Sequence, residues 1–323
     1  MSTHILLAYG FDGKGHGRQL TGEAISKEIK SHNLAWVHLD ADHPDTRKWL
    51  EEEVSYLDTF ITEALLADET RPRMTQLNDG VLLILRGVNL NENADPEDMV
   101  SIRLWIDENR IISVRRRKLR AILDIEEKIK SSKAPKNAGD FACMLVARLF
   151  ERMEPVLTTL DESTDNIEEK ILENADTNLR ETIINIRKKA IMFRRYMAPQ
   201  KDAIGQLRML DVSWLNETHK RSLYESHNRI TRYVEDLDAI RERAQIVKDE
   251  LANILADRLN KNMYVLSVIA AIFLPLGFLT GLLGINVGGI PGTDDPNAFY
   301  LFSSILIFLV VAQVVIFKKL KWF

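Results

Sequence analysis

Two long stretches without a charged side chain lie close together near the end of the chain, and they constrain its fold most. Residues 262–293 and residues 298–317 contain no Asp, Glu, Lys, Arg or His. A helix needs about 20 mostly apolar residues to cross the hydrocarbon core of a bilayer. Globular cores rarely contain one such stretch, so two buried core helices are the weaker interpretation. We therefore predict an integral membrane protein with transmembrane helices over 263–286 and 298–317.

Charged residues beside these stretches predict the topology. Arg258 and Lys261 precede the first span, and lysines follow the second in the basic tail 318–323. The connecting loop 287–297 has two aspartates but no Lys or Arg. The positive-inside rule then places both termini in the cytoplasm and the loop on the outer side of the membrane. The first residues have no basic segment followed by an apolar core, so we expect no signal peptide.

The composition excludes several other classes of protein. With 46% hydrophobic and 28% charged residues, the chain is neither disordered nor of low complexity. Its single cysteine, Cys143, excludes a disulfide framework and a multi-thiolate zinc site. A formal net charge of −4 argues against nucleic acid as a partner. The sequence has no recognisable catalytic constellation, so we expect neither an enzyme nor a bound cofactor.

Residues 1–138 have the pattern of a cytoplasmic mixed α/β domain. Apolar periodicity predicts one helix over 46–67. The glycine-rich segment 10–17 is interpreted as a hairpin turn, because Gly15 follows Lys14 where a phosphate-binding loop needs Ser or Thr. Strands are expected at Ile5–Tyr9, Ala35–Leu39 and Val81–Val88, and a hairpin from Ser101–Ile106 and Arg110–Val114.

After residue 138, long amphipathic segments indicate helices. We predict a pair of long antiparallel helices over 139–211, with the acidic run 161–176 as a solvated helix tip. A stalk helix over 212–262 follows. No Gly or Pro occurs from Val212 to Leu274, so the stalk is expected to run unbroken into the first span. Such a helix could pass movement of the soluble domain directly to the membrane.

Two spans cannot enclose a pore, so conduction requires several copies around one axis. A polar or small stripe at helical spacing, which runs from Asp249 through Asn253, Ala256 and Asn260 to Met263, could border water on that axis. An ordinary solvated helix face explains the same spacing equally well. The hairpin alone does not establish transport, because anchors and sensors also use such hairpins.

The candidate site lies at the outer end of the first span. Gly277, Gly281 and Gly284 recur on one side of this helix, either to let helices pack closely or to leave a bore open to a hydrated ion. Asn286 is the one strongly polar side chain there, and a ring of its amides could hydrogen-bond the water shell of a cation. Alternatively, Asn286 is a helix C-cap. Asp294 and Asp295 either add negative charge at the outer mouth or belong to a solvated loop.

The same residues carry a family resemblance. The run MYVLSVIAAIFLPLGFLTGLLGIN over 263–286 resembles the pore helix and Gly-Met-Asn signature of CorA-type divalent-cation transporters, and the tail FKKLKW is similar to theirs. The signature here is Gly284-Ile285-Asn286, with Ile where the family has Met. The string PLGFLTGLLGINVGGIPG resembles the zinc-transporter (ZntB) branch, as do Thr70–Arg73 (TRPR) and Arg194–Gln200 (RRYMAPQ).

This resemblance implies an α/β cytoplasmic funnel domain, long helices and a two-helix hairpin, assembled as a homopentamer in the bacterial inner membrane. Its partners would be the lipid bilayer and divalent metal ions. It also implies an acidic ring at Asp249, and Gly277 departs from a family pattern that has threonine there. The pore-lining positions that it implies are Met263, Leu266, Leu274, Gly277, Gly281 and Asn286.

Zinc as the cargo comes from the resemblance alone, with Ni²⁺, Cd²⁺ or Co²⁺ as further ions and proton-coupled uptake as an expectation. The spans contain no His, Cys, Asp or Glu, so they lack the nitrogen and sulfur ligands that zinc prefers. An ion at Asn286 would therefore pass largely hydrated. A Mg²⁺ or Co²⁺ channel gated by intracellular ion is an alternative, and a non-conducting membrane-anchored sensor is another.

A regulatory metal site is a further hypothesis. His38, Asp40, Asp42 and His43 crowd one strand end and have the side-chain types that ligate metals. The alternative is a strand terminus followed by a helix cap. The basic cluster 115–118 is interpreted as a solvated junction or a positive collar, not as a nucleic-acid site.

Overall fold

The computed structural model describes residues 3–284, 290, 292 and 294–319. The chain divides into two compact units, Met1–Asp249 and Glu250–Phe323.

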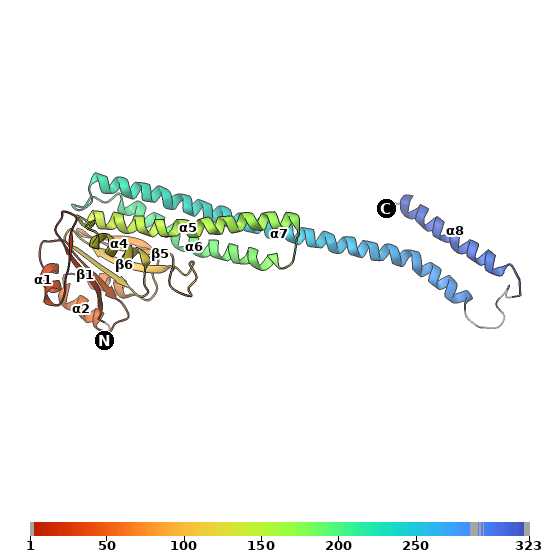
Figure 1. The fold of residues 1–323 in the computed structure, drawn as a ribbon, viewed down its shortest axis with the longest axis horizontal. Coiled ribbons are helices and arrows are strands. Elements are labelled where there is room, and N and C mark those ends of the chain that lie inside the picture. Colours follow the sequence, from red (N-terminus) through yellow and green to blue (C-terminus); the bar gives the residue numbers. More distant parts are fainter. Residues whose placement is uncertain (1–2, 285–289, 291, 293, 320–323) are drawn as a thin grey trace. The chain divides into compact units, whose positions relative to one another are not determined.

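The first unit contains a seven-stranded mixed sheet (Figure 1). Its strand order is β2-β1-β3-β7-β6-β5-β4, and all neighbours are antiparallel except β3 and β7. The expected strands and the β6–β7 hairpin are confirmed, and segment 10–17 is the predicted hairpin turn. The strands are β1 (Ile5–Phe11), β2 (Gly17–Gln19), β3 (Ala35–Asp40), β4 (Arg73–Leu77), β5 (Gly80–Gly87), β6 (Val100–Ile106) and β7 (Arg110–Arg115).

Three short helices pack on one face of this sheet: α1 (Glu23–Ile29), α2 (Asp45–Glu53) and α3 (Thr59–Leu66). Val37 and Leu39 of β3 point into that core. The predicted single helix over 46–67 was wrong in one respect, because α2 and α3 are separate. The break has a local cause: the Asp58 side chain accepts a hydrogen bond from the backbone amide of Phe60 and starts a new helix.

Longer helices pack on the other face of the sheet. They are α5 (Ala138–Glu173) and α6 (Leu179–Leu207), with α4 (Arg120–Lys130) beside α5. Trp36 of β3 faces this side, where its ring centroid lies 5.0 Å from that of Phe141 of α5. Residues 174–178 connect α5 to α6, and the two helices lie side by side (Figure 1).

The longest helix, α7 (Glu217–Leu283), has residues in both units. It begins later than the predicted Val212, because the side-chain oxygen of Asn216 accepts a hydrogen bond from the backbone amide of His219 (3.0 Å) and caps the helix. The predicted continuity into the first span is confirmed, and α7 continues through Pro275. Within the first unit, Arg243 of α7 pairs with carboxylates of α5, and Arg194 of α6 pairs with Asp238 of α7 (2.5 Å).

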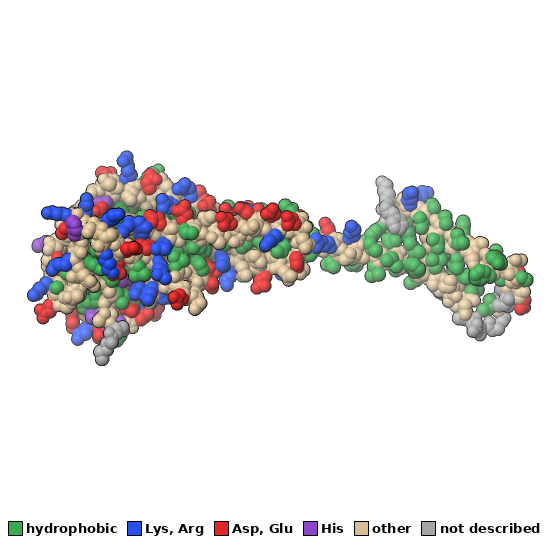
Figure 2. All heavy atoms as spheres, in the orientation of Figure 1, with side chains coloured by type: hydrophobic (Ala, Val, Ile, Leu, Met, Phe, Trp, Pro, Cys, Tyr) green, Lys and Arg blue, Asp and Glu red, His purple; other side chains and the backbone are tan. Residues whose placement is uncertain are grey.

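The second unit consists of the last part of α7 and helix α8 (Ala298–Lys319). Both helices are long and apolar enough to cross a membrane. Their most apolar 18-residue windows are 6% and 0% buried, respectively. Hydrophobic side chains cover this unit in Figure 2, whereas charged side chains are scattered over the first unit. The chain by itself leaves the apolar surface of both helices uncovered, which fits insertion in lipid.

Candidate ion pathway

One side of α7 faces α8. Val268 is buried, and Ala271, Ile272, Pro275 and Leu279 are partly buried, whereas most other positions of this apolar segment are exposed. The side chain of Gln313 in α8 donates from Nε2 to the Ala271 carbonyl oxygen (3.3 Å). These positions recur every three or four residues and form one stripe along α7.

The predicted pore-lining residues lie on a different side of α7. Met263, Leu266 and Leu274 are 66%, 68% and 74% exposed. A methyl group placed on Gly277 or Gly281 would have no neighbouring atom within 4 Å, so α8 does not require glycine at either position. At about 100° per residue, this side is roughly opposite the one that faces α8. The structure therefore leaves the predicted pore side free for water or another copy of the chain.

A contact that the sequence did not predict joins the two helices beside Pro275. Proline has no backbone N–H, so it leaves the carbonyl four residues earlier without its helical hydrogen bond. That carbonyl belongs to Ala271, and the Gln313 amide donates to it. An unpaired carbonyl is expensive in hydrocarbon, and a neighbouring helix can supply the missing donor. The sequence contained a signal for this contact: Pro275 lies in one apolar stretch, and Gln313 is the one side-chain amide in the other, 298–317.

The signature at the end of α7 is described in part. The Gly284 amide donates to the Thr280 carbonyl (2.9 Å), which closes the last turn. Ile285 and Asn286 lie outside the described residues. Asp294 is exposed, and an Asp295 carboxylate oxygen accepts a hydrogen bond from the Asn297 amide (2.9 Å) near the start of α8. This hydrogen bond leaves the other Asp295 carboxylate oxygen without a partner from the Asn297 amide, so a charge at the outer mouth stays a prediction.

Asp249 is the last residue of the first unit. Its carboxylate oxygens accept hydrogen bonds from Nε2 of Gln245, one turn earlier, at 2.9 and 2.8 Å. The side chain is 60% exposed, so it is accessible to a solvated ion.

The four residues of the hypothetical regulatory site are not brought together. His38 is fully buried in β3, where its Nδ1 lies 2.8 Å from the Ser113 hydroxyl, and burial lowers its pKa to about 3. The Asp40 carboxylate accepts a hydrogen bond from the backbone amide of Asp42, and Asp42 pairs with Arg116. His43 lies instead beside His4 and Asp45. The alternation of a strand explains the separation, because His38 points to the face covered by α5.

The basic cluster is largely neutralised by carboxylates. Arg116 pairs with Asp42 and with Asp68 (2.7 Å), and Arg117 pairs with Asp98 (3.2 Å). These pairs tie the end of β7 to loops on both sides. Arg116 and Arg117 thus form a strand-to-helix junction, which is one of the two interpretations that the sequence left open.

The two motifs of the first unit that resemble the zinc-transporter branch meet at Arg86 of β5. Its guanidinium donates two hydrogen bonds to the Thr70 carbonyl (2.9 and 3.2 Å). The same guanidinium lies over the ring of Tyr196, with its carbon 4.1 Å from the ring centroid. The backbone amide of Arg86 donates to Oε1 of Gln200, which is fully buried (2.6 Å). The motifs therefore anchor α6 to the sheet.

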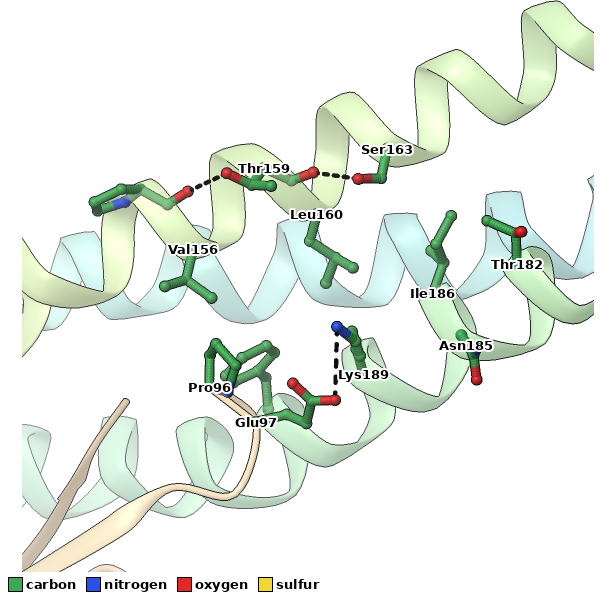
Figure 3. Close-up of a pocket in the computed structure, with 12 residues that line it drawn as sticks. Pro96, Glu97, Val156, Thr159, Leu160, Ser163, Thr182, Asn185, Ile186 and Lys189 are labelled. Carbon is green, nitrogen blue, oxygen red and sulfur yellow. Dashed lines mark hydrogen bonds and ion pairs between the residues drawn. The ribbon is translucent and has the colours of Figure 1, made fainter. Parts of the chain in front are cut away.

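A hollow of about 470 Å³ lies between the loop before β6 and helices α5 and α6 (Figure 3). Glu97 is buried at its edge, with one carboxylate oxygen 3.7 Å from Nζ of Lys189. The hydroxyls of Thr159 and Ser163 donate to carbonyls of the preceding turn of α5. The described residues that line this hollow include no His, so no imidazole lies beside these hydroxyls as a general base.

Comparisons with known proteins agree with this architecture. The family model described as CorA-like Mg2+ transporter protein matches residues 31–319. The divalent cation transporter CmaX of Pseudomonas aeruginosa is 36% identical over 323 residues, covering 98% of this chain and 96% of the relative. The zinc transport protein ZntB of Yersinia enterocolitica is 34% identical over 315 residues, with coverage of 98% and 95%.

Solved structures show the same fold. Full-length CmaX superposes with a TM-score of 0.85 at 34% identity and covers 98% of each chain. The ZntB cytoplasmic domain from Vibrio parahaemolyticus gives 0.70 at 28% identity, covering 79% of this chain and all of its own. The complete CorA magnesium transporter from Methanocaldococcus jannaschii gives 0.79 at 18% identity with full coverage of both chains, which is a likeness of fold alone.

Proposed function

We propose that this chain, which belongs to the CorA-like Mg2+ transporter family, is one protomer of a homopentamer that carries Zn²⁺ across the bacterial inner membrane. The family is one of transporters, not enzymes. The relatives named as zinc transport proteins, which cover nearly the whole chain, support zinc as the cargo. Residues 1–262 and the tail 318–323 would then lie in the cytoplasm, as the distribution of Lys and Arg indicates.

The free side of α7 is the observation that carries the proposal. This side faces away from α8 and is exposed in the single chain. Its residues are Met263, Leu266, Leu274, Gly277 and Gly281. Two helices cannot surround an ion, so this side requires other copies of α7. We assign it to the axis of the assembly, where each protomer contributes one helix to the lining.

Selection would take place at Asn286. Five amide oxygens in a ring would bind the water shell of a cation without removing it, since neither span contains His, Cys, Asp or Glu. Asp294 and Asp295 would concentrate cations outside, and Asp249 would form an acidic ring below the membrane. A hydrated ion is discriminated poorly, so Ni²⁺, Co²⁺ and Cd²⁺ should follow the same path.

Flux in liposomes tests this proposal. Purified protein is reconstituted with a zinc-sensitive and a pH-sensitive dye inside, and Zn²⁺ is added with and without an inward proton gradient. We expect Zn²⁺ entry, and entry that grows with the gradient would support proton-coupled uptake. Asn286→Ala should lower the initial rate at least tenfold, whereas the matched loop variant Asn297→Ala should keep it. An unchanged rate in Asn286→Ala would contradict the assignment of the selective ring.

A Mg²⁺ or Co²⁺ channel is the second candidate, favoured by the description of the matching family model. In the same liposomes, Mg²⁺ entry as fast as Zn²⁺ entry and independent of the proton gradient would support it. The absence of flux for every ion would favour the third possibility, a membrane-anchored sensor.

A further inference from the structure

Two histidines and an aspartate meet at one edge of the first unit, and neither the pore nor the sheet core uses them. His4 precedes β1, His43 lies in the turn after β3, and Asp45 is the first residue of α2. One ring nitrogen of each histidine and one carboxylate oxygen of Asp45 all lie within 4.8 Å of one another. The imidazole centroids are 5.8 Å apart, and Nδ1 of His43 is 3.7 Å from Oδ2 of Asp45.

The backbone holds these three residues in place. The Asp40 amide donates to the His4 carbonyl (2.9 Å), so the start of β1 is fixed against the end of β3. The Thr46 amide donates to the His43 carbonyl (3.1 Å), and the Thr46 hydroxyl donates to the Asp40 carbonyl (2.5 Å). The turn that carries His43 and Asp45 is therefore closed before any ligand arrives, which lowers the entropy cost of binding.

His4 offers a ring nitrogen that no protein group in the described residues uses. Its Nε2 is shielded from solvent and has no hydrogen-bond partner among the described residues. A shielded ring nitrogen without a hydrogen-bond partner destabilises the fold, so binding of a metal ion at this nitrogen would be favourable. The Trp49 ring, whose centroid lies 6.3 Å from that of His4, supplies an apolar wall.

We propose that His4, His43 and Asp45 bind one transition-metal ion of the Zn²⁺, Co²⁺ and Ni²⁺ class. Two imidazole nitrogens and a carboxylate oxygen suit these borderline ions, whereas Mg²⁺ requires oxygen ligands in an octahedron. Ligand atoms about 2.1 Å from a tetrahedral ion are about 3.4 Å apart, so a pair separated by 4.8 Å must close by about 1.4 Å. Side-chain torsions supply that movement, and the exposed Asp45 leaves the fourth position open to water.

The site lies within one protomer and does not depend on the proposed transport function. Binding is therefore measured at equilibrium, without flux. The full chain in detergent is titrated with Co²⁺, whose visible absorption intensifies in a four-coordinate site. In His4→Gln and His43→Gln, the number of Co²⁺ ions bound per protomer should fall by one, or the affinity for this ion should fall at least tenfold. Zn²⁺ should displace this ion, and a hundredfold excess of Mg²⁺ should not.

His16→Gln is the matched control, because His16 pairs with Asp12 at 3.1 Å on the surface without a second histidine. Asp45→Ala is a further variant whose exposed side chain does not threaten folding, and it should also weaken binding. Co²⁺ bound here should quench Trp49 emission, so Trp49→Phe should lose that quenching but keep the ion. Equal stoichiometry and affinity in the unaltered chain, His4→Gln and His43→Gln would overturn the site, as would an equal loss in His16→Gln.

Discussion

His38 is a buried neutral histidine, and its environment makes the stability of the first unit depend on pH. It is fully buried, with Ser113 as its hydrogen-bond partner, and burial together with the charge of Arg115 lowers its pKa to about 3. A histidine in the unfolded chain has a pKa near 6.5. Protonation therefore favours the unfolded state, so this contribution is complete above pH 6.5 and is lost as the pH falls toward 3.

We predict that acidification from pH 7 to pH 5 removes about 2 kcal/mol of stability through His38. Thermal melting of the full chain in detergent measures this effect. His38→Asn should melt lower than the unaltered chain at pH 7 but lose less between pH 7 and 5. The exposed His16→Asn variant serves as the control and should retain the full dependence. Equal pH dependence in His38→Asn and the unaltered chain would contradict the assignment.

The sequence predicted side-chain types better than it predicted their neighbours. It identified His38 and His43 as metal-ligand types, but His38 points into the sheet core and His43 meets His4. His4 pairs with the end of β3 only after the antiparallel β1–β3 register is set. A register is a long-range property, so a single sequence does not indicate whether His4 will approach His38 or His43.

At the scale of single elements, the contact between Gln313 and the Ala271 carbonyl predicts a double-mutant cycle. Gln313→Leu leaves that carbonyl unpaired opposite Pro275, so stability of the full chain should fall by about 1 kcal/mol. A Pro275→Ala background restores a backbone N–H at this position, which can donate to the Ala271 carbonyl. Gln313→Leu should therefore cost much less in that background. The measurement is denaturation in mixed micelles.

The coupling between the two substitutions is the decisive quantity. Leu306→Ala in α8, which lacks a hydrogen-bonding group, should behave the same in both backgrounds and serves as the control. If Gln313→Leu is equally costly with Pro275 in place and in the Pro275→Ala background, the amide does not replace the missing proline donor.

Arg243 joins α7 to α5 within the first unit. Its guanidinium donates twice to Glu168 at 2.8 Å, to Asp161 at 3.0 Å and also to Asp165. We predict that Arg243→Leu lowers stability by about 1–3 kcal/mol, since several charge-assisted hydrogen bonds are lost together. Arg243→Lys keeps the positive charge and should recover part of the loss. The recovery should be incomplete, because the lysine ammonium lacks the planar fork with which arginine binds Glu168 through two parallel donors.

Thermal melting at low and high salt measures this loss, which should shrink as salt screens the carboxylates. Arg241→Leu is the control, because Arg241 pairs with Asp238 on its own helix at 3.4 Å. An equal loss of stability in Arg243→Leu and Arg241→Leu would contradict a larger contribution from the ion pairs between Arg243 and α5. The acidic run 161–176 is therefore not only a solvated helix tip. Three of its carboxylates, those of Asp161, Asp165 and Glu168, pair with Arg243 of α7.

Long periodic elements were predictable and their ends were less so. The continuity of α7 followed from the absence of Gly and Pro, but its start depends on the Asn216 cap. The helix over 46–67 has continuous apolar periodicity, yet Asp58 divides it. Capping is decided by one side chain and one amide, and periodicity does not detect it.

At the scale of the whole molecule, the membrane-inserted character and the family were predictable because both rest on long segments of sequence. The pore-lining positions that the resemblance implied are exposed on the side of α7 that faces away from α8, and their role in a pathway stays a prediction. The metal cluster at His4 was not predictable, because its members come from two distant segments.

Substituted cysteines test the central claim that the free side of α7 lines a cation pathway. In a Cys143→Ser background, Leu274→Cys lies on that side and Ile272→Cys on the side partly covered by α8. Zn²⁺ entry into liposomes is measured before and after treatment with a small cationic thiol reagent. We predict that the reagent blocks entry through Leu274→Cys and leaves Ile272→Cys unaffected. Block of Ile272→Cys alone, or of neither variant despite complete labelling, would contradict the proposed pathway.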